Sequence, residues 1–226
     1  MPDSKKAFTL VELLVVISII LIASSIIFIG GGGGDGAKLS SAQRIVSGIA
    51  QGARGQAILK NGETRLIIYN EVNDPEKYRR YFGIVYWGDD VDDNGNVIAT
   101  GWKAATQGTF LPEGIYFDPD LSTDFGSNRG NLAEEISLNY PRIRVGANTN
   151  KDSGGGSESY HTYGFSSNGT SLNPNEWLTL RAGVLRSKGD GYEINFDDPD
   201  KKSLKSALIF RRSGSVTRVD DPEDIE

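Results

Sequence analysis

The residues with the clearest chemical potential stand near the N-terminus, where two lysines, a small residue, an aromatic residue and a carboxylate follow one another. The segment reads Lys5-Lys6-Ala7-Phe8-Thr9-Leu10-Val11-Glu12. An apolar run continues from it to Ile29, so Glu12 lies within a segment long enough to enter a membrane. A carboxylate inside such a segment costs free energy and therefore indicates a functional site.

The apolar run has the length of a membrane-spanning helix. Phe8 to Ile29 is 22 residues, and at about 1.5 Å per residue a helix of that length crosses a hydrocarbon core of ~30 Å. A secretory signal has a shorter apolar region with a small-residue cleavage site after it, whereas here the run ends in Gly30–Gly34. The two lysines predict a cytoplasmic N-terminus. On hydropathy alone, a plain single-pass anchor for a periplasmic domain is the alternative.

The same segment resembles the class III signal of type IV prepilins and type II secretion pseudopilins. This resemblance implies that a prepilin peptidase cleaves between Ala7 and Phe8 and methylates the new amine of Phe8. It also implies that Glu12 is kept for assembly with other pilin or pseudopilin subunits. Ala7 stands where glycine is usual in that family. The expected location is the bacterial inner membrane, with a single pass and a periplasmic C-terminal domain that joins a filament.

Composition predicts one acidic, loop-rich domain beyond the membrane segment. The chain has 226 residues, a net charge of −6, 28 glycines and no cysteine. Loss of residues 1–7 would remove two lysines and one aspartate and leave a net charge of −7. Without disulfides the domain must be held by its core alone. The acidic balance argues against generic binding to nucleic acid.

The chain divides into five predicted parts: a leader peptide (1–7), a transmembrane and assembly helix (8–29), a glycine-rich break (30–36), a pilin-like globular domain (37–219) and an acidic disordered tail (220–226). Helical periodicity returns from Ala37 to Leu59 and places seven apolar residues on one face: Leu39, Ala42, Ile45, Val46, Ile49, Ala53 and Ala57. Asn61-Gly62 supplies a stop. We therefore expect an α+β fold, in which the amphipathic half of a long N-terminal helix packs on an antiparallel β-sheet.

Short apolar runs separated by turn residues such as Asn94-Gly95 predict the strands of that sheet. The expected strands are Thr64–Tyr69, Tyr81–Trp87, Val97–Trp102, Gly114–Phe117, Ile143–Val145, Thr162–Phe165, Trp177–Arg181, Tyr192–Phe196, Leu204–Arg211 and Ser215–Val219. A Gly/Ser-rich loop is expected at Thr149–Ser159.

Four local stretches, taken in order, resemble the GspH/FimT class of minor pseudopilins and minor pilins. They are Ala53-Arg54-Gly55-Gln56-Ala57, Leu111-Pro112-Glu113-Gly114-Ile115, the run Tyr163–Thr170 and the run Ile209–Val216. Insertions at 74–80 and 146–160 depart from the compact pattern of that class. The resemblance implies a structural subunit of minor type.

Asp90, Asp92 and Asn94 give two interpretations of one loop. The run Asp90-Val91-Asp92-Asp93-Asn94-Gly95 has the D-x-D-x-N-G opening of a calcium loop. Position twelve of such a loop is Gly101, so the usual bidentate carboxylate is absent. The other interpretation is an acidic hairpin turn built on Asn94-Gly95.

No catalytic constellation stands out in the sequence. His161 is the single histidine and cysteine is absent, so a usual zinc site cannot form within one chain. His161 has no G-x-S-x-G partner motif, and Gly30–Gly34 lacks the ending of a P-loop. We therefore expect a non-enzymatic protein without a required cofactor.

A filament-tip binding module is the remaining alternative, either a calcium-dependent adhesin or a DNA-uptake receptor. Eight arginines could line a basic groove for DNA: Arg79, Arg80, Arg142, Arg144, Arg181, Arg186, Arg211 and Arg212. Solvated arginines on strands are the favoured interpretation, since the whole chain is acidic.

We predict that the protein purified from its native membrane lacks residues 1–7 and carries one added methyl group on Phe8. The reason is the position of the Ala7–Phe8 bond directly before the apolar run. Intact-mass spectrometry measures both changes. A mature chain that begins at Met1 or after Gly30 would contradict this prediction.

Overall fold

The structure is a computed structural model that describes residues 34–122, 135–142, 158–172, 174–189 and 191–220. The predicted membrane helix at 8–29 and the predicted strand at 143–145 lie outside these residues. Within the described part of the chain, no helix combines the length and the apolar character needed to cross a bilayer.

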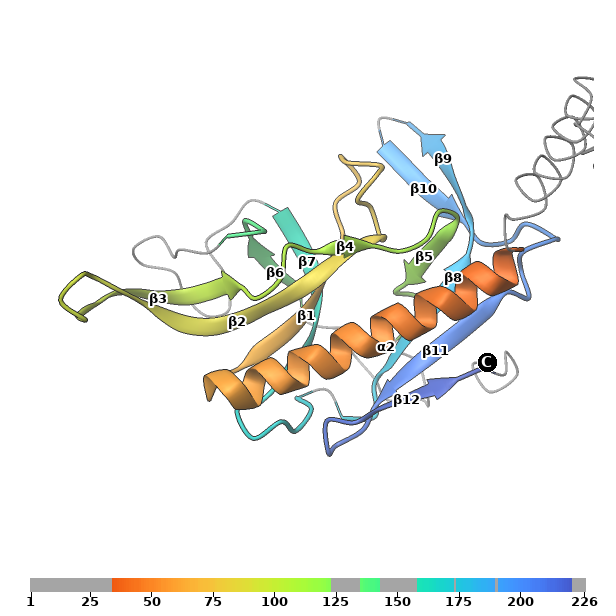
Figure 1. The fold of residues 1–226 in the computed structure, drawn as a ribbon. Helices are drawn as coiled ribbons and strands as arrows, with labels where there is room; N and C mark the ends of the chain where they lie inside the picture. Colours follow the sequence, from red (N-terminus) through yellow and green to blue (C-terminus); the bar gives the residue numbers. More distant parts are fainter. Residues whose placement is uncertain (1–33, 123–134, 143–157, 173, 190, 221–226) are drawn as a thin grey trace, which may run out of the picture. The chain divides into compact units, whose positions relative to one another are not determined.

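One long helix, α2 (Asp35–Lys60), opens the described domain (Figure 1). It begins two residues before the predicted start at Ala37, so the glycine-rich break expected at 30–36 is wrong for Asp35 and Gly36. Asp35 explains the difference, because a carboxylate in the first turn interacts favourably with the helix dipole. It also forms ion pairs with Lys38 at 3.4 Å and with Lys201 at 3.3 Å.

The buried face of α2 is built mostly of small residues: Leu39, Ala42, Gln43, Val46, Ala50, Ala53 and Ala57. The sequence predicted five of these seven, but it placed Gln43 on another face and did not select Ala50. Ile45, which was expected inside, is 38% exposed. Because alanine is neither strongly apolar nor polar, the periodicity alone did not fix the centre of the buried face.

The helix ends at the predicted stop. Asn61 adopts a positive φ of 47°, and the amide of Gly62 donates to the carbonyl of Ala57 at 3.2 Å. This left-handed residue after the last turn satisfies carbonyls that the helix leaves unpaired.

The strands form two antiparallel sheets and one separate ribbon (Figure 1). The larger sheet contains β1 (Thr64–Tyr69), β2 (Tyr81–Val91), β3 (Val97–Ala104), β4 (Thr109–Phe110), β6 (Glu135–Leu138) and β7 (Glu158–Phe165). Its order is β3-β2-β1-β7-β6, with β4 paired to β2. The smaller sheet, in the order β12-β11-β8-β5, contains β5 (Ile115–Asp118), β8 (Trp177–Ala182), β11 (Lys205–Phe210) and β12 (Val216–Val219). The ribbon pairs β9 (Val184–Lys188) with β10 (Gly191–Asn195).

This arrangement confirms the predicted α+β class. Every predicted strand among the described residues has a counterpart, and β1 agrees to the residue. The strands β4, β6 and β9 were not predicted, because each is short or mostly exposed. β7 begins at Glu158, so the end of the predicted loop at 149–159 is wrong for Glu158 and Ser159.

The central strand β1 is buried on both faces. Leu66 and Ile68 belong to the core that also contains the buried face of α2. Ile67 and Tyr69 belong to a second cluster, in which Tyr160 is completely buried. A strand that is buried on both faces consists of consecutive apolar residues in the sequence, as Leu66–Tyr69 does.

We predict that Phe210→Ala lowers the free energy of unfolding of the region from Asp35 onward by about 3–5 kcal/mol. Phe210 is fully buried and stacks on Tyr163 with ring centroids 4.5 Å apart. Phe110→Ala is the matched control, because Phe110 is 44% exposed. Chemical denaturation followed by circular dichroism measures both, and equal losses would contradict the assignment of the core.

Candidate functional site

The predicted processing and assembly residues Ala7, Phe8 and Glu12 lie outside the described residues. The described domain presents two other surfaces with unusual charge or exposure. One is the tip of the β2–β3 hairpin, and the other is a groove between the start of α2 and the strands β11 and β12.

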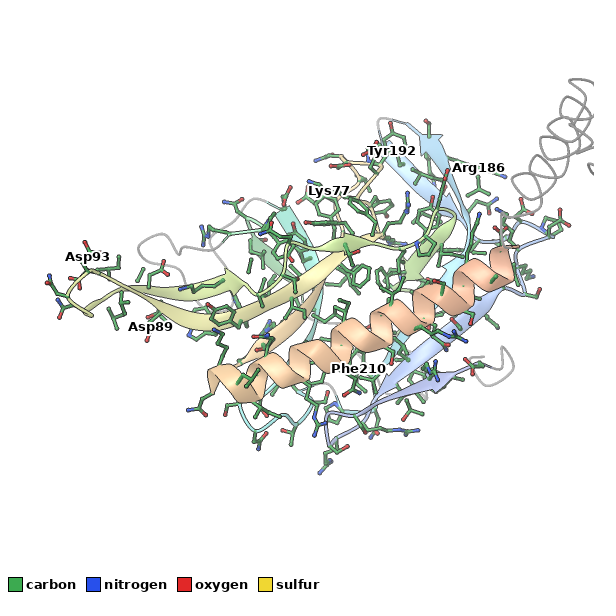
Figure 2. The ribbon with its side chains drawn as sticks, viewed as in Figure 1. Lys77, Asp89, Asp93, Arg186, Tyr192 and Phe210 are labelled. Carbon is green, nitrogen blue, oxygen red and sulfur yellow. The ribbon has the colours of Figure 1, made fainter. Side chains whose placement is uncertain are left out.

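The hairpin extends beyond the sheet to which it belongs. β1 pairs with β2 only as far as Tyr86, whereas β2 and β3 continue to pair with each other as far as Val91 and Val97. Figure 2 shows Asp89 and Asp93 on this projecting arm. We call residues 89–98 the hairpin tip.

A pair of tryptophans anchors the base of the arm. Trp87 and Trp102 lie opposite each other in the register, and their rings meet edge to face with centroids 5.3 Å apart. The guanidinium of Arg65 lies 4.8 Å from the centre of the Trp102 ring. Cross-strand aromatic pairs of this kind stabilise a ribbon that has no neighbouring strand.

Three large apolar side chains are exposed at the hairpin tip. Val91 is 57% exposed, Val97 is 58% exposed and Ile98 is 63% exposed. Single exposed apolar residues need no explanation, but a group of three on a projecting arm is a feature of contact surfaces.

The carboxylate of Asp92 builds the turn between the two strands. It accepts hydrogen bonds from the amides of Asn94 and Asn96 at 2.9 and 2.8 Å, and from the side-chain amide of Asn96 at 3.0 Å. Gly95 takes the positive φ of 84° that the turn requires. The Asn96 side chain is the largest influence, followed by the backbone amides, and together they lower the pKa of Asp92 below its ordinary value.

Two of the three predicted calcium ligands, Asp90 and Asp92, are engaged by other groups of the protein. The carboxylate of Asp90 is buried and lies 2.6 Å from the ammonium of Lys103, while that of Asp92 is engaged by its own turn. Asn94 takes part in the turn through its backbone amide. Within the described residues, no group of three or more histidine, aspartate and glutamate side chains could hold a metal ion. The geometry fits the acidic hairpin turn.

The second surface is a groove of about 290 Å³ at the other end of α2. It is lined by Gly36, Leu39, Ser40, Gln43, Arg44, Lys205, Ser206, Arg218 and Asp220. Gln43 forms its base: this side chain is 3% exposed, and its amide donates to the carbonyls of Ala207 at 3.2 Å and Val219 at 3.0 Å. One buried amide therefore joins α2 to both β11 and β12. We call this surface the α2–β12 groove.

The groove carries cations on its rim. Arg44 and Arg218 are exposed, and neither forms an ion pair with another described residue. Ser206 is 5% exposed, and its hydroxyl has no hydrogen-bond partner among the described residues. Arg44 and Arg218 therefore give this end of α2 exposed positive charge, while the Ser206 hydroxyl is enclosed.

Three of the arginines considered for a DNA groove are engaged within the domain. The guanidinium of Arg80 donates to the carbonyl of Leu111 at 3.1 Å, and that of Arg79 lies over the ring of Tyr78. Arg181 pairs with Asp118 at 2.9 Å. These three arginines support the fold, while Arg144 lies outside the described residues.

A second cleft in the described domain and the histidine do not form a catalytic arrangement. A cleft of about 460 Å³ contains Asp118, which is 1% exposed and neutralised by Arg181. His161 lies in β7, where its Nδ1 is 3.6 Å from a carboxylate oxygen of Glu135 on β6. Neither place combines a nucleophile with a base oriented toward it.

Residues 3–28 match the family model described as the prokaryotic N-terminal methylation motif. The chain carries this motif. The match confirms the predicted methylation-type signal, while the individual roles of Ala7, Phe8 and Glu12 stay predictions. No curated protein matches the chain.

Three solved structures are similar to the chain. The type IV minor pilin FimU of Pseudomonas aeruginosa is 12% identical with a TM-score of 0.36, and the alignment covers 83% of this chain and 91% of that one. Two structures of the minor pseudopilin EpsH from the type II secretion system of Vibrio cholerae have a TM-score of 0.38. They are 11% and 14% identical, and cover 80% and 83% of this chain and 96% and 95% of those chains.

The sequence did not reveal the α2–β12 groove. Its residues come from 36–44 and from 205–220, which are far apart in the chain. The one local signal is Arg44, which follows Ser40 by four positions on a polar side of the helix. Arg218 reaches the α2–β12 groove only because β12 pairs with β11.

We predict that Asn96→Ala raises the pKa of Asp92 toward its ordinary value, because the Asn96 side chain makes the largest contribution to lowering it. In the parent, the stabilising effect of the ionised turn is complete above the unfolded-state pKa of about 3.9. It is lost as the pH falls through the lower folded-state pKa. NMR titration of the Asp92 carboxyl carbon measures this. An unchanged pKa, or a carboxyl signal that moves with millimolar calcium, would contradict the role of Asp92 in the turn.

Proposed function

We propose that this chain is a structural subunit, of minor type, of a type II secretion pseudopilus or a type IV pilus-like filament. The observation that carries the proposal is the N-terminal methylation motif at residues 3–28, followed by a folded domain that begins at Asp35. A prepilin peptidase would cut between Ala7 and Phe8 and methylate Phe8. The filament would then assemble from chains that share this N-terminal design.

Before assembly, residues 8–29 would anchor the chain in the inner membrane. Lys5 and Lys6 would hold the uncleaved N-terminus in the cytoplasm. The domain that begins at Asp35 would therefore lie on the periplasmic side. This location gives the peptidase access to the Ala7–Phe8 bond at the cytoplasmic boundary of the membrane.

Assembly would bring many apolar helices together outside the lipid. Within such a bundle, the amine of Phe8 on one subunit and the carboxylate of Glu12 on its neighbour can neutralise each other. Burying either charge alone costs several kcal/mol, so the pairing offsets a cost that would otherwise oppose assembly. Glu12 would thereby set the axial position of each incoming subunit.

The outward face of α2 supports a helical bundle. Residues Ser41, Ile45, Gly48 and Gly52 are exposed, and their spacing of three or four places them on one side of the helix. Small residues let another helix approach closely, while Ile45 supplies apolar contact. The face opposite to the sheets is therefore suited to packing against other helices.

A structural role agrees better with the domain than catalysis or DNA uptake does. The carboxylate in the larger cleft is neutralised by an arginine, and the arginines considered for DNA support neighbouring strands and rings. A plain anchored domain would share the membrane helix but would gain nothing from a carboxylate at Glu12. The behaviour of Glu12 therefore separates the filament subunit from the anchor.

We predict that Glu12→Leu leaves membrane insertion and Ala7–Phe8 cleavage intact while incorporation into filaments falls roughly ten-fold or more. Loss of the charge removes the partner for the Phe8 amine, which then remains buried without compensation. Co-purification with the other filament subunits measures incorporation, and intact mass measures cleavage.

Ser18→Leu is the matched control, because it removes a polar group from the same segment without changing the charge. We expect this variant to assemble as the parent does. A Glu12→Leu protein that is incorporated at the parental level would remove the main physical support for the filament mechanism.

A further inference from the structure

We propose that residues 221–226 bind back onto the α2–β12 groove of the same molecule and cover its two exposed arginines, Arg44 and Arg218. We call these residues the 221–226 segment. They lie outside the described residues, whereas the groove consists entirely of described ones. The contact is internal to one chain, so it goes beyond the proposed function and does not depend on assembly into a filament.

The course of β12 directs the chain into the groove. Asp220, the last described residue, lines the groove, and the 221–226 segment follows it directly. The register of β11 with β12 sets Ala207 opposite Val219. Two further residues in the same register would set position 221 opposite Lys205, which also lines the groove. The chain would therefore leave β12 along the groove, and six extended residues reach up to about 20 Å from Asp220.

The segment and the groove carry opposite charge. The segment reads Asp221-Pro222-Glu223-Asp224-Ile225-Glu226, with four carboxylates and no cation. Arg44 on α2 and Arg218 on β12 are exposed and form no ion pair with another described residue, while Lys205 already has an interaction. The two arginines therefore present cations from both walls of the groove to the carboxylates that follow Asp220.

The helical wall of the groove leaves space for an extended chain. Gly36, Ser40 and Arg44 recur at every fourth position of α2, so they lie along one side of the helix. All three are exposed, and a Cβ atom added at Gly36 would meet no other atom within 4 Å. A chain that runs along this side would pass two small residues and reach the guanidinium of Arg44.

Pro222 suits the segment to this course. Proline has no amide hydrogen and cannot donate to a neighbouring strand, so regular pairing with β11 would end there. It also disfavours the helical conformation at the residue before it, Asp221. The segment would therefore neither lengthen the sheet nor begin a helix, and its backbone would stay extended beside α2.

The covalent connection makes a weak contact sufficient. One exposed ion pair changes an equilibrium constant only a few-fold. Because the segment is attached at Asp220, its effective concentration at the groove is of millimolar order, and no second molecule has to be immobilised. Several weak pairs acting together can therefore hold a tethered segment that would not bind as a free peptide. The segment would act as a built-in cover, which an anionic partner must displace before it reaches Arg44 and Arg218.

A spin label on the 221–226 segment of the full-length protein tests the contact. The chain has no cysteine, so Ile225→Cys provides one attachment site and preserves every charge. We expect electron paramagnetic resonance to show a slowly moving component at ~0.01 M salt, where the Debye length is ~30 Å, and to lose most of it at ~1 M salt, where the Debye length is ~3 Å. A label that moves freely at low salt would overturn the proposal.

Neutralising the two arginines tests their part in the contact. Arg44→Gln with Arg218→Gln should reduce the slow component at low salt about ten-fold, because two ion pairs of a few-fold each are lost. Arg211→Gln with Arg212→Gln is the matched control, since both arginines are exposed, lie outside the groove and remove the same charge. Equal losses in the two variants would show a general effect of net charge and would overturn the proposal.

Charge exchange and dilution complete the test. Glu223→Arg with Asp224→Arg should abolish the slow component, and the further changes Arg44→Glu and Arg218→Glu should restore it. The component should not change when the protein is diluted, because the contact lies within one molecule. A component that the exchange fails to restore, or that disappears on dilution, would overturn the proposal. Incorporation into filaments is measured separately through Glu12, so either conclusion can fail while the other stands.

Discussion

The close approach of α2 to two sheets at once is the constraint on which the rest of the domain depends. Ala42, Ala50, Ala53 and Ala57 are completely buried, and their short side chains let strands from both sheets reach the helix. The core contains residues of β1 and β2 from the larger sheet and of β8 and β11 from the smaller one. Longer side chains at these positions would separate the sheets from the helix, because a close-packed interior has no space to absorb them. The positions of the arm and the groove relative to each other follow from this single helix.

Much of this fold could be predicted where the signal is local. The helix was found from its periodicity, β1 from a continuous apolar run, and the hairpin from Asn94-Gly95, whose glycine has a positive φ. The strand β4 has only two residues and is defined by its pairing with β2. A strand this short has no alternating pattern of apolar residues from which it could be predicted. Gln43 was placed on the wrong face because a polar residue is ordinarily exposed, and only the carbonyls of Ala207 and Val219 make its burial favourable.

The candidate sites also differ in whether a local sequence pattern could predict them. The N-terminal motif could be recognised because its residues are contiguous. Their order in the sequence therefore already gives their arrangement in the motif. The sequence pattern drew attention to the loop at Asp90 and Asp92, but it could not say which group each carboxylate contacts. The register of β2 with β3 decided that, by placing Lys103 beside Asp90. The groove depends on strands from the other end of the chain and left no local pattern.

The hydrogen bonds of Gln43 also bear on the order in which the domain can form. Its amide binds carbonyls that are 164 and 176 residues further along the chain. α2 is among the first parts of the domain to be synthesised, yet its partners in β11 and β12 are among the last. Long-range contacts of this kind form slowly, because a large loop must close before they contribute. Nearly the whole chain must therefore be synthesised before the helix acquires its final neighbours.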